Sequence, residues 1–340
     1  MAQDNILVDP FGRRVSNLRI SLTDLCNFRC VYCMPPEGLP SVVPASSYLT
    51  RQEIVRFVRI MGGLGVTHVR LTGGEPLLRK DILDIIRALK SVETVKDLSI
   101  TTNGSRLGPM VRDLKEAGLD RMNISLDSLD PKRFEEITLS DTYAEVLGSV
   151  FEALQAGFPV KLNMVVLRGI TSKDIVEYVR MACEYPLDVR FLEFMPLCGT
   201  GWRPDLVWPI GKVRAVVMEN FDLAEDDVPR LDKPAQTFKI RGGKGKVGFI
   251  ASLTENFCDQ CSRIRISADG KIQPCLFSDT QVSVKNLLRD NAPDEDIVRA
   301  IQLAVGLKPR GNWFRDKPFR FEEDKDLAFA ANPMIHSIGG

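Results

Sequence analysis

The sequence predicts an α/β fold built around a parallel sheet. Strand patterns and helix patterns alternate six times between about residues 18 and 221, and such alternation implies parallel strands joined by right-handed crossovers. Six units fall short of the eight of a closed (β/α)8 barrel, so an open partial barrel and a doubly wound sheet both remain open. In either fold the active site lies at the carboxyl ends of the strands. Five segments rich in polar residues or glycine stand there, TDLCN, TGGEP, TTNG, SLDS and EFMP.

The first helix shows how the elements are recognised. Thr50 and Glu53 form a capping box, in which each side chain bonds the backbone N–H of the other. Apolar residues then recur at helical spacing until a glycine pair and Gly65 end the helix. The six predicted strands are 18–24, 66–72, 97–103, 120–128, 160–169 and 188–196. The helices that follow them are predicted from residue 50 and at 81–92, 110–118, 142–157, 172–185 and 210–221.

The character of the sequence changes after residue 221. An acidic segment containing prolines (223–234) reads as a surface linker, and 237–253 reads as a hairpin with GGKG at its turn. One more helix is predicted at 294–307. We therefore expect a partial barrel at 1–221 and a C-terminal appendage at 222–340 that packs back on it.

Composition narrows the class of protein. Lysine plus arginine and aspartate plus glutamate both number 45, so no global basic field exists for nucleic acid or an anionic membrane. The N-terminal sequence has no apolar core of a signal peptide, and no apolar run approaches the ~20 residues of a membrane-spanning helix. These features predict a cytoplasmic protein, in which clustered cysteines are more often metal ligands than disulfides.

Six of the eight cysteines fall into two groups of three, and we interpret the remaining two, Cys183 and Cys198, as packing residues. Cys198 follows a predicted strand, so a place near a site stays open for it. The groups are Cys26, Cys30 and Cys33, and Cys258, Cys261 and Cys275.

The first group has the spacing C-x3-C-x2-C on one loop. Structural zinc requires four ligands, and neither histidine of the chain, His68 or His336, is near this loop. Three thiolates suit a four-iron, four-sulfur (4Fe–4S) cluster, because the fourth iron then stays open for a small molecule. The second group also lacks a fourth ligand, although its C-x2-C keeps a zinc site among the alternatives. Arg263 and Arg265 follow it at a spacing of two, so both guanidiniums should lie on one face and form an anion site.

The first group and TGGEP together resemble the radical S-adenosylmethionine (SAM) enzymes. Glycines let a ligand approach the backbone, and Glu75 can accept hydrogen bonds from an ammonium. The resemblance implies a partial (β/α)6 barrel. It also implies that SAM chelates the open iron and is split to a 5′-deoxyadenosyl radical.

The whole pattern more closely resembles the GTP 3′,8-cyclase family of molybdenum-cofactor biosynthesis. Both three-cysteine groups, RIR after the second and the terminal Gly339-Gly340 carry this resemblance. It implies a second 4Fe–4S cluster in the appendage whose open iron binds the guanine of GTP. It implies removal of hydrogen from the ribose 3′ carbon and attack of that carbon on carbon 8, giving (8S)-3′,8-cyclo-7,8-dihydroguanosine 5′-triphosphate. In the family the Gly-Gly tail reaches toward the active site.

The resemblance assigns roles to individual positions. All six clustered cysteines would be iron ligands, and those of the first group would act in catalysis with Arg263 and Arg265. The positions that match SAM contacts are Tyr32, Gly74, Glu75, Ser125 and Met195. Those that match GTP contacts are Arg19, Arg70, Thr101, Lys161, Arg263 and Arg265.

The resemblance also implies an electron donor and a downstream cyclic pyranopterin monophosphate synthase that receives the product, and it leaves a homodimer open. Two other functions stand as alternatives. A radical SAM peptide maturase usually carries more downstream cysteines than the three present here. A zinc-binding adaptor without chemistry would hold zinc and no iron.

Overall fold

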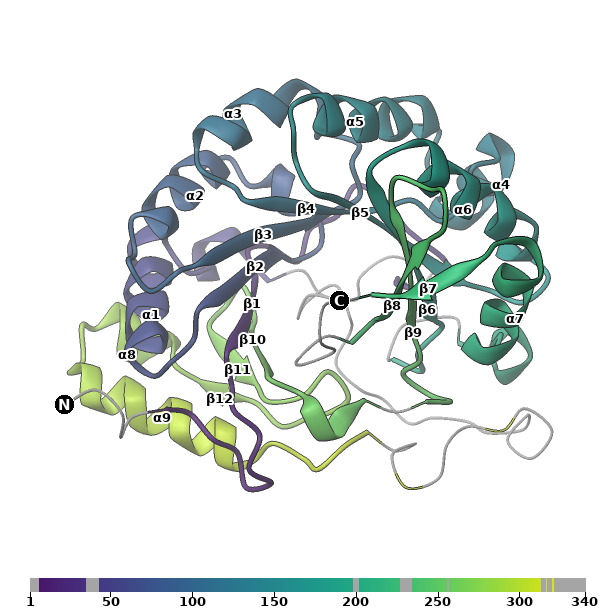
Figure 1. Cartoon of the computed structure of the whole chain (residues 1–340). Coiled ribbons are helices and arrows are strands. Elements are labelled where there is room, and N and C mark those ends of the chain that lie inside the picture. Colours follow the sequence, from purple (N-terminus) through teal and green to yellow (C-terminus); the bar gives the residue numbers. More distant parts are fainter. Residues whose placement is uncertain are drawn as a thin grey trace.

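The computed structural model describes residues 6–34, 43–197, 202–226, 234–255 and 257–312, together with residues 316 and 320. Its centre is one sheet of twelve strands in the order β12-β11-β10-β1-β2-β3-β4-β5-β6-β9-β8-β7. The run from β10 to β9 is parallel throughout, and the two strands beyond each end of it are antiparallel. Figure 1 shows this sheet bent into an arc, with α1 to α6 along its outer side. The fold is therefore an open barrel of α/β type.

The parallel strands of the predicted units are β1 (Asn17–Ser21), β2 (His68–Thr72), β3 (Asp97–Thr102), β4 (Arg121–Ser125), β5 (Val160–Val166) and β6 (Leu187–Glu193). The remaining strands are β7 (Leu223–Glu225), β8 (Gln236–Ile240), β9 (Lys246–Ile250), β10 (Arg263–Ile266), β11 (Lys271–Gln273) and β12 (Val282–Ser283). The α-helices are α1 (Arg51–Gly63), α2 (Ile82–Lys90), α3 (Val111–Glu116), α4 (Pro131–Thr138), α5 (Tyr143–Gln155), α6 (Ile175–Glu184), α7 (Ile210–Asn220), α8 (Lys285–Arg289) and α9 (Asp294–Gly306). Short 3-10 helices are η1 (Ala45–Ser47), η2 (Pro76–Leu78), η3 (Gly108–Met110), η4 (Thr171–Asp174), η5 (Pro204–Leu206) and η6 (Cys258–Gln260).

The six predicted strand–helix units are confirmed. The capping box at the start of α1 is present, with the backbone N–H of Glu53 3.2 Å from Thr50 Oγ1 and that of Thr50 2.7 Å from Glu53 Oε2. The sequence did not predict α4, although its N-terminal signals are ordinary: Asp130 caps it and Pro131 occupies its first turn.

The sheet extends beyond the six units at both edges. Strand β10 pairs with β1 in parallel, and β9, the second strand of the predicted hairpin, pairs with β6 in parallel. Both added strands come from the region after residue 221, so this region completes the barrel wall. The proposed boundary at 221/222 falls between α7 and β7 in an otherwise continuous sheet.

Side chains alternate strictly in burial along β5 and β6, as the period of a strand requires. In β5, Val160, Leu162, Met164 and Val166 are buried, whereas Lys161, Asn163 and Val165 alternate with them and are only partly buried. Strand β6 repeats the pattern. The apolar set packs in the core, and the alternate set lines the hollow side of the arc together with charged residues of neighbouring strands. A polar interior is thus built into the barrel.

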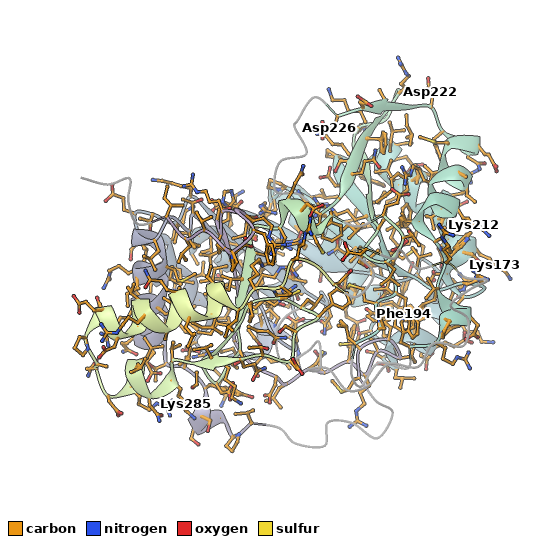
Figure 2. The ribbon with its side chains drawn as sticks, turned by 90° about the horizontal axis from the view of Figure 1, so that it is seen from below. Lys173, Phe194, Lys212, Asp222, Asp226 and Lys285 are labelled. Atoms are coloured by element: carbon orange, nitrogen blue, oxygen red, sulfur yellow. The ribbon has the colours of Figure 1, made fainter. Side chains whose placement is uncertain are left out.

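The β7–β8–β9 end and the α8 end are separate regions of the molecule. Figure 2 places Asp222 and Asp226 at the outer end of the first and Lys285 on the second, well apart. Asp226 Oδ1 forms an ion pair with Lys246 Nζ at 2.9 Å, which stabilises the hairpin. Within the described residues no helix is long and apolar enough to cross a membrane.

Candidate active site

The first cysteine loop is a tight turn fixed to α4. The backbone N–H groups of Cys33 and Met34 both bond the carbonyl of Cys30, at 2.9 and 3.0 Å. Those of Arg29 and Val31 bond the carbonyls of Thr138 and Ile137, at the end of α4. The helix that the sequence did not predict therefore anchors the loop from outside.

Gly73 and Gly74 follow β2 and lie against the same loop. A Cβ on Gly73 would stand 2.4 Å from the carbonyl oxygen of Thr23, and one on Gly74 2.1 Å from that of Leu25. Gly74 N also bonds Thr23 O at 2.8 Å. The sequence-based reason for these glycines, close approach of a ligand, is thus incomplete, because the chain itself needs the space to dock the cysteine loop.

Glu75 is fully enclosed and already bonded by the protein. Its carboxylate accepts from Leu77 N at 3.0 Å, Thr102 Oγ1 at 2.7 Å and Asn103 N at 2.7 Å. Burial raises its pKa to about 7 despite these three donors. A carboxylate offers about four acceptor positions, so about one remains for an outside donor such as an ammonium.

A cavity, here called the first-cluster cavity, lies at the carboxyl ends of the strands beside this loop. Tyr32 closes one side of it and donates a hydrogen bond of 2.6 Å to Asp127, whose other oxygen accepts from Val165 N at 2.9 Å. Burial raises the pKa of Asp127 to about 6. The residues around this cavity include Cys26, Cys30, Tyr32, Cys33, Gly73, Gly74, Glu75, Thr101, Ser125, Asp127, Asn163, Leu192 and Met195.

The second cysteine group borders a neighbouring second-cluster cavity. Cys261 Sγ lies 3.6 Å from Arg263 Nη2 and 3.6 Å from Lys308 Nζ. Burial opposes ionisation of this thiol, but Arg263 and Lys308 outweigh it and lower the pKa to about 6. The residues around this cavity include Arg19, Arg70, Thr101, Asn163, Arg190, Leu192, Met195, Ser252, Cys258, Cys261, Arg263, Arg265, Cys275 and Lys308.

Two cations hold the loop of the second group in place. Lys308 donates to the carbonyls of Arg263 at 2.5 Å and Pro274 at 2.9 Å, which ties both chain segments that carry the cysteines. Arg13 pairs with Asp9 and donates to the carbonyl of Cys258 at 2.8 Å. The pattern of the sequence had not singled out either residue for this group.

A third hollow, here called the basic mouth, opens at the amino ends of the strands. It shares Arg19, Arg70, Arg190, Pro234 and Arg263 with the second-cluster cavity and adds His68, Asp97, Arg121 and Lys161. Burial, and after it the nearby Arg190, lower the pKa of Lys161 to about 7. Burial, followed by Arg121 and Arg190, lowers that of Arg70 to about 9. So many buried cations in one place call for an anion.

Unpaired polar atoms mark the same region. Among the described residues, buried side-chain atoms without a hydrogen-bond partner include Thr101 Oγ1, Asn163 Oδ1, Arg190 Nε and Ser252 Oγ. All four residues border the second-cluster cavity. Buried polar groups are rarely left unpaired in proteins, so this cavity fits a polar ligand.

Six free cysteines, three beside each cavity, form a thiolate donor set of the kind that fits iron–sulfur clusters. Within the described parts of the chain, no three His, Cys, Asp or Glu side chains converge closely enough to hold one metal ion. No described cysteine forms a disulfide.

The structure brings the predicted site residues together around the three connected hollows. Those predicted for SAM border the first-cluster cavity, and those predicted for GTP border the second-cluster cavity or the basic mouth. Arg263 and Arg265 share one face of β10, as their spacing predicted, and Arg265 pairs with Arg19 in register. Cys183 is partly buried against the core. Cys198 and Gly339-Gly340 lie outside the described residues.

Comparison with known proteins identifies the family of the chain. Residues 20–182 match the Radical SAM superfamily and residues 187–314 match Molybdenum Cofactor Synthesis C. The chain is 40% identical over 313 residues to the GTP 3′,8-cyclase of Thermodesulfovibrio yellowstonii, covering 92% of this chain and 97% of that protein. The chain belongs to the GTP 3′,8-cyclase family. Another member, the Arabidopsis thaliana protein named GTP 3′,8-cyclase, mitochondrial, is 41% identical over 99% of this chain and 84% of its own length.

Two further comparisons relate this family member to a longer protein and to a solved structure. It is 42% identical to molybdenum cofactor biosynthesis protein 1 of Bos taurus over 89% of this chain and 48% of that longer protein. Among solved structures, anSMEcpe with bound AdoMet has a TM-score of 0.57 at 14% identity, over 92% of this chain and 86% of that one. At that identity the likeness shows the radical SAM fold alone. Superfamily members carry a 4Fe–4S cluster and SAM, in agreement with the first-cluster cavity.

Proposed function

We propose that this protein cyclises GTP to (8S)-3′,8-cyclo-7,8-dihydroguanosine 5′-triphosphate, an early step of molybdenum-cofactor biosynthesis. The observation that carries the proposal is the placement of two cysteine triads around adjoining cavities, with buried cations at the far end. Close relatives over nearly the full chain bear the name of this activity.

The first triad, Cys26, Cys30 and Cys33, holds the cluster that activates SAM. The family's SAM contacts correspond to Tyr32, Gly74, Glu75, Ser125 and Met195, which border the same cavity. When bound, the reduced cluster and SAM supply the radical chemistry that starts the reaction. The chain's own part is to hold SAM: Asp127 fixes the Tyr32 hydroxyl, and the carboxylate of Glu75 keeps about one acceptor position for the ammonium.

The second triad, Cys258, Cys261 and Cys275, holds a second 4Fe–4S cluster beside the guanine. Arg263 and Arg265 flank it, and Thr101 offers an unpaired hydroxyl in the same cavity. Arg19, Arg70 and Lys161 continue the line of cations toward the basic mouth. Arginine forks match phosphate oxygens, so the triphosphate points toward that mouth and the ribose lies between the two ends.

The shared border of the two cavities sets where the chemistry happens. Thr101, Asn163, Leu192 and Met195 border both the first-cluster and the second-cluster cavity. Hydrogen removal from the ribose requires the SAM-derived carbon to meet the ribose directly. These four residues mark the place where the two ligands meet and where water must be excluded.

The test is anaerobic incubation of the reconstituted protein with SAM, a chemical reductant and GTP, followed by mass spectrometry and NMR of the product. The cyclised triphosphate is expected together with 5′-deoxyadenosine and methionine. Modification of a peptide, or zinc in place of iron in the purified protein, would contradict the proposal. An electron donor and transfer of the product to cyclic pyranopterin monophosphate synthase belong to the same proposal, since relatives are named for this reaction and for molybdenum-cofactor biosynthesis. A cytoplasmic location and a homodimer are further parts of the proposal.

A further inference from the structure

Asn163 occupies the border between the two cavities and has an unused acceptor. It lies on β5 and borders both the first-cluster and the second-cluster cavity. Its amide oxygen is buried and has no hydrogen-bond partner among the described residues. No role was assigned to it from the sequence, since a single asparagine within a strand carries no motif.

The register of the sheet places Asn163 between the two proposed ligands. Its neighbour on β4 is Ser125, a proposed SAM contact, and its neighbour on β6 is Arg190, which borders the second-cluster cavity and the basic mouth. Lys161 stands two residues earlier on the same face of β5, toward the mouth. Asn163 therefore stands at the level where the ribose must lie if guanine and triphosphate occupy opposite ends.

The chemistry of the side chain narrows the groups of GTP that can partner it. A carboxamide oxygen is an acceptor only, and leaving it buried without a donor costs free energy. The triphosphate offers no donor at neutral pH, and the guanine lies at the cysteine end of the cavity. Ribose hydroxyls are the remaining donors on GTP: the 3′-hydroxyl is bonded to the carbon that loses hydrogen, and the 2′-hydroxyl to its neighbour.

We propose that Asn163 is a positioning residue whose amide oxygen accepts a hydrogen bond from a ribose hydroxyl of GTP, turning the 3′ carbon toward the SAM cavity. This inference rests on the proposed function. It adds a determinant of ribose recognition that is separate from the cations at the phosphate end and from the arginines beside the second cluster.

The test compares GTP with its 2′-deoxy and 3′-deoxy analogues on cluster-loaded protein, by anaerobic calorimetry. Asn163→Leu keeps the shape of the side chain and removes the acceptor. We expect it to weaken GTP binding about threefold to tenfold, the range for one neutral hydrogen bond. It should weaken binding of one deoxy analogue much less, and that analogue identifies the hydroxyl. Asn163→Asp keeps an acceptor oxygen and should restore the preference for GTP over that analogue.

Ser252→Ala provides the matched control. Ser252 Oγ is also buried and unpaired among the described residues, but Ser252 borders only the second-cluster cavity. This variant should leave the ratio of affinities for GTP and both analogues as in the unaltered protein. Equal losses for GTP and both analogues in Asn163→Leu would overturn the inference, because a structural role affects all three ligands alike.

A second measurement reports on positioning itself. In Asn163→Leu saturated with GTP, the ratio of 5′-deoxyadenosine to cyclised product should rise, because SAM cleavage continues while the ribose is misaligned. An unchanged ratio would overturn the positioning role. Failure of the unaltered protein to bind GTP at all would instead refute the proposed function, so the two failures are distinguishable.

Discussion

The two cysteine triads have the same number of thiols but opposite electrostatic surroundings. In the first, burial raises the pKa of Cys26 to about 11 and that of Cys33 to about 12, and the carboxylates Glu75 and Asp127 add to these respective increases. In the second, the neighbouring cations Arg263 and Lys308 outweigh burial at Cys261 and lower its pKa to about 6. The first triad thus lies beside carboxylates. Cys261 of the second lies beside cations, whereas burial raises the pKa of Cys258 in the same triad.

The charges around the two triads, rather than the thiolates themselves, distinguish the ligands that each triad suits. An acidic surrounding suits SAM, which carries a sulfonium and an ammonium, whereas cations beside the second triad suit GTP, which is an anion. The same charges act on bound clusters, because nearby cations favour the reduced, more negative state and nearby anions oppose it. We therefore expect the first cluster to have the more negative reduction potential, as a centre that must donate an electron requires.

The sharpest test of the comparison removes one ligand from each triad. Cys26→Ala should abolish SAM cleavage and product formation together, because Cys26 is a proposed iron ligand of the SAM centre. Cys275→Ala should abolish cyclised product but spare part of the uncoupled SAM cleavage. Iron content and chromatographic detection of 5′-deoxyadenosine measure both. Full iron content in either variant, or total loss of cleavage in folded Cys275→Ala, would remove the division of labour.

The arginines beside the second triad should contribute the next largest effect. Removing both in Arg263→Ala/Arg265→Ala is expected to weaken GTP binding by ~1.5–3 kcal/mol per lost charged hydrogen bond. Arg→Lys at these positions should recover only part of it, because lysine lacks the fork. Calorimetric titration of cluster-loaded protein provides the measurement.

Arg241→Ala is the matched control for that experiment, since Arg241 pairs with Asp222 on the exposed hairpin, away from the cavities. It should leave GTP affinity unchanged. Wild-type affinity in the double variant, or a large drop in melting temperature with unchanged affinity of the folded fraction, would favour a structural role for Arg263 and Arg265.

Proton linkage at Lys161 gives a smaller effect. Burial and Arg190, followed by Arg121 and Arg70, lower the pKa of Lys161 to about 7. Asp188, whose carboxylate lies 3.7 Å from the amine, opposes this decrease. A bound triphosphate favours the charged amine, so binding takes up a proton once free Lys161 is neutral. GTP affinity should therefore fall as pH rises from 7 to 9, by at most about tenfold per pH unit. Lys161→Met should flatten this pH dependence of the GTP affinity. An unchanged slope would show that another group takes up the proton.

The smallest expected effect concerns Lys308. Lys308→Met should shift the reduction potential of the second cluster to a more negative value without moving that of the first, because one positive charge beside Cys261 is lost. Redox titration followed by EPR would resolve the two clusters. Lys308→Arg, which keeps the charge, should stay near the original value. A shift of both potentials, or of neither, would contradict the local electrostatic explanation.

Local patterns predicted much of the architecture. Alternation of strands and helices gave the six units, and the capping box of Thr50 and Glu53 gave the start of α1. Helix α4 was missed although Asp130 and Pro131 carry the usual start signals. What local patterns could not supply was the partner of each added strand. Nothing in the sequence near β9 or β10 states that these strands join β6 and β1, since pairing across long separations depends on the assembled fold.

The site shows the same division. Motif spacing identified the cysteines, Arg263 and Arg265, because their chemistry is local in sequence. Lys308 reaches Cys261 from beyond the end of α9, and Asn163 and Arg190 face the lumen only because of strand register. Such residues become visible only when side-chain direction and neighbouring strands are known.

The pairing of β1 with β10 also has a consequence for the making of this protein. Asn17 of β1 lies opposite Arg263 of β10. Strand β1 is synthesised early, but its hydrogen bonds on this side can form only after β10, one of the last strands, has been synthesised. Until then β1 and β6 are edges with unpaired backbone groups, and such edges promote association between chains. Contacts so far apart in sequence also slow folding. Nascent or truncated chains that end before β9 are therefore expected to depend on chaperones and to aggregate more readily than the full chain.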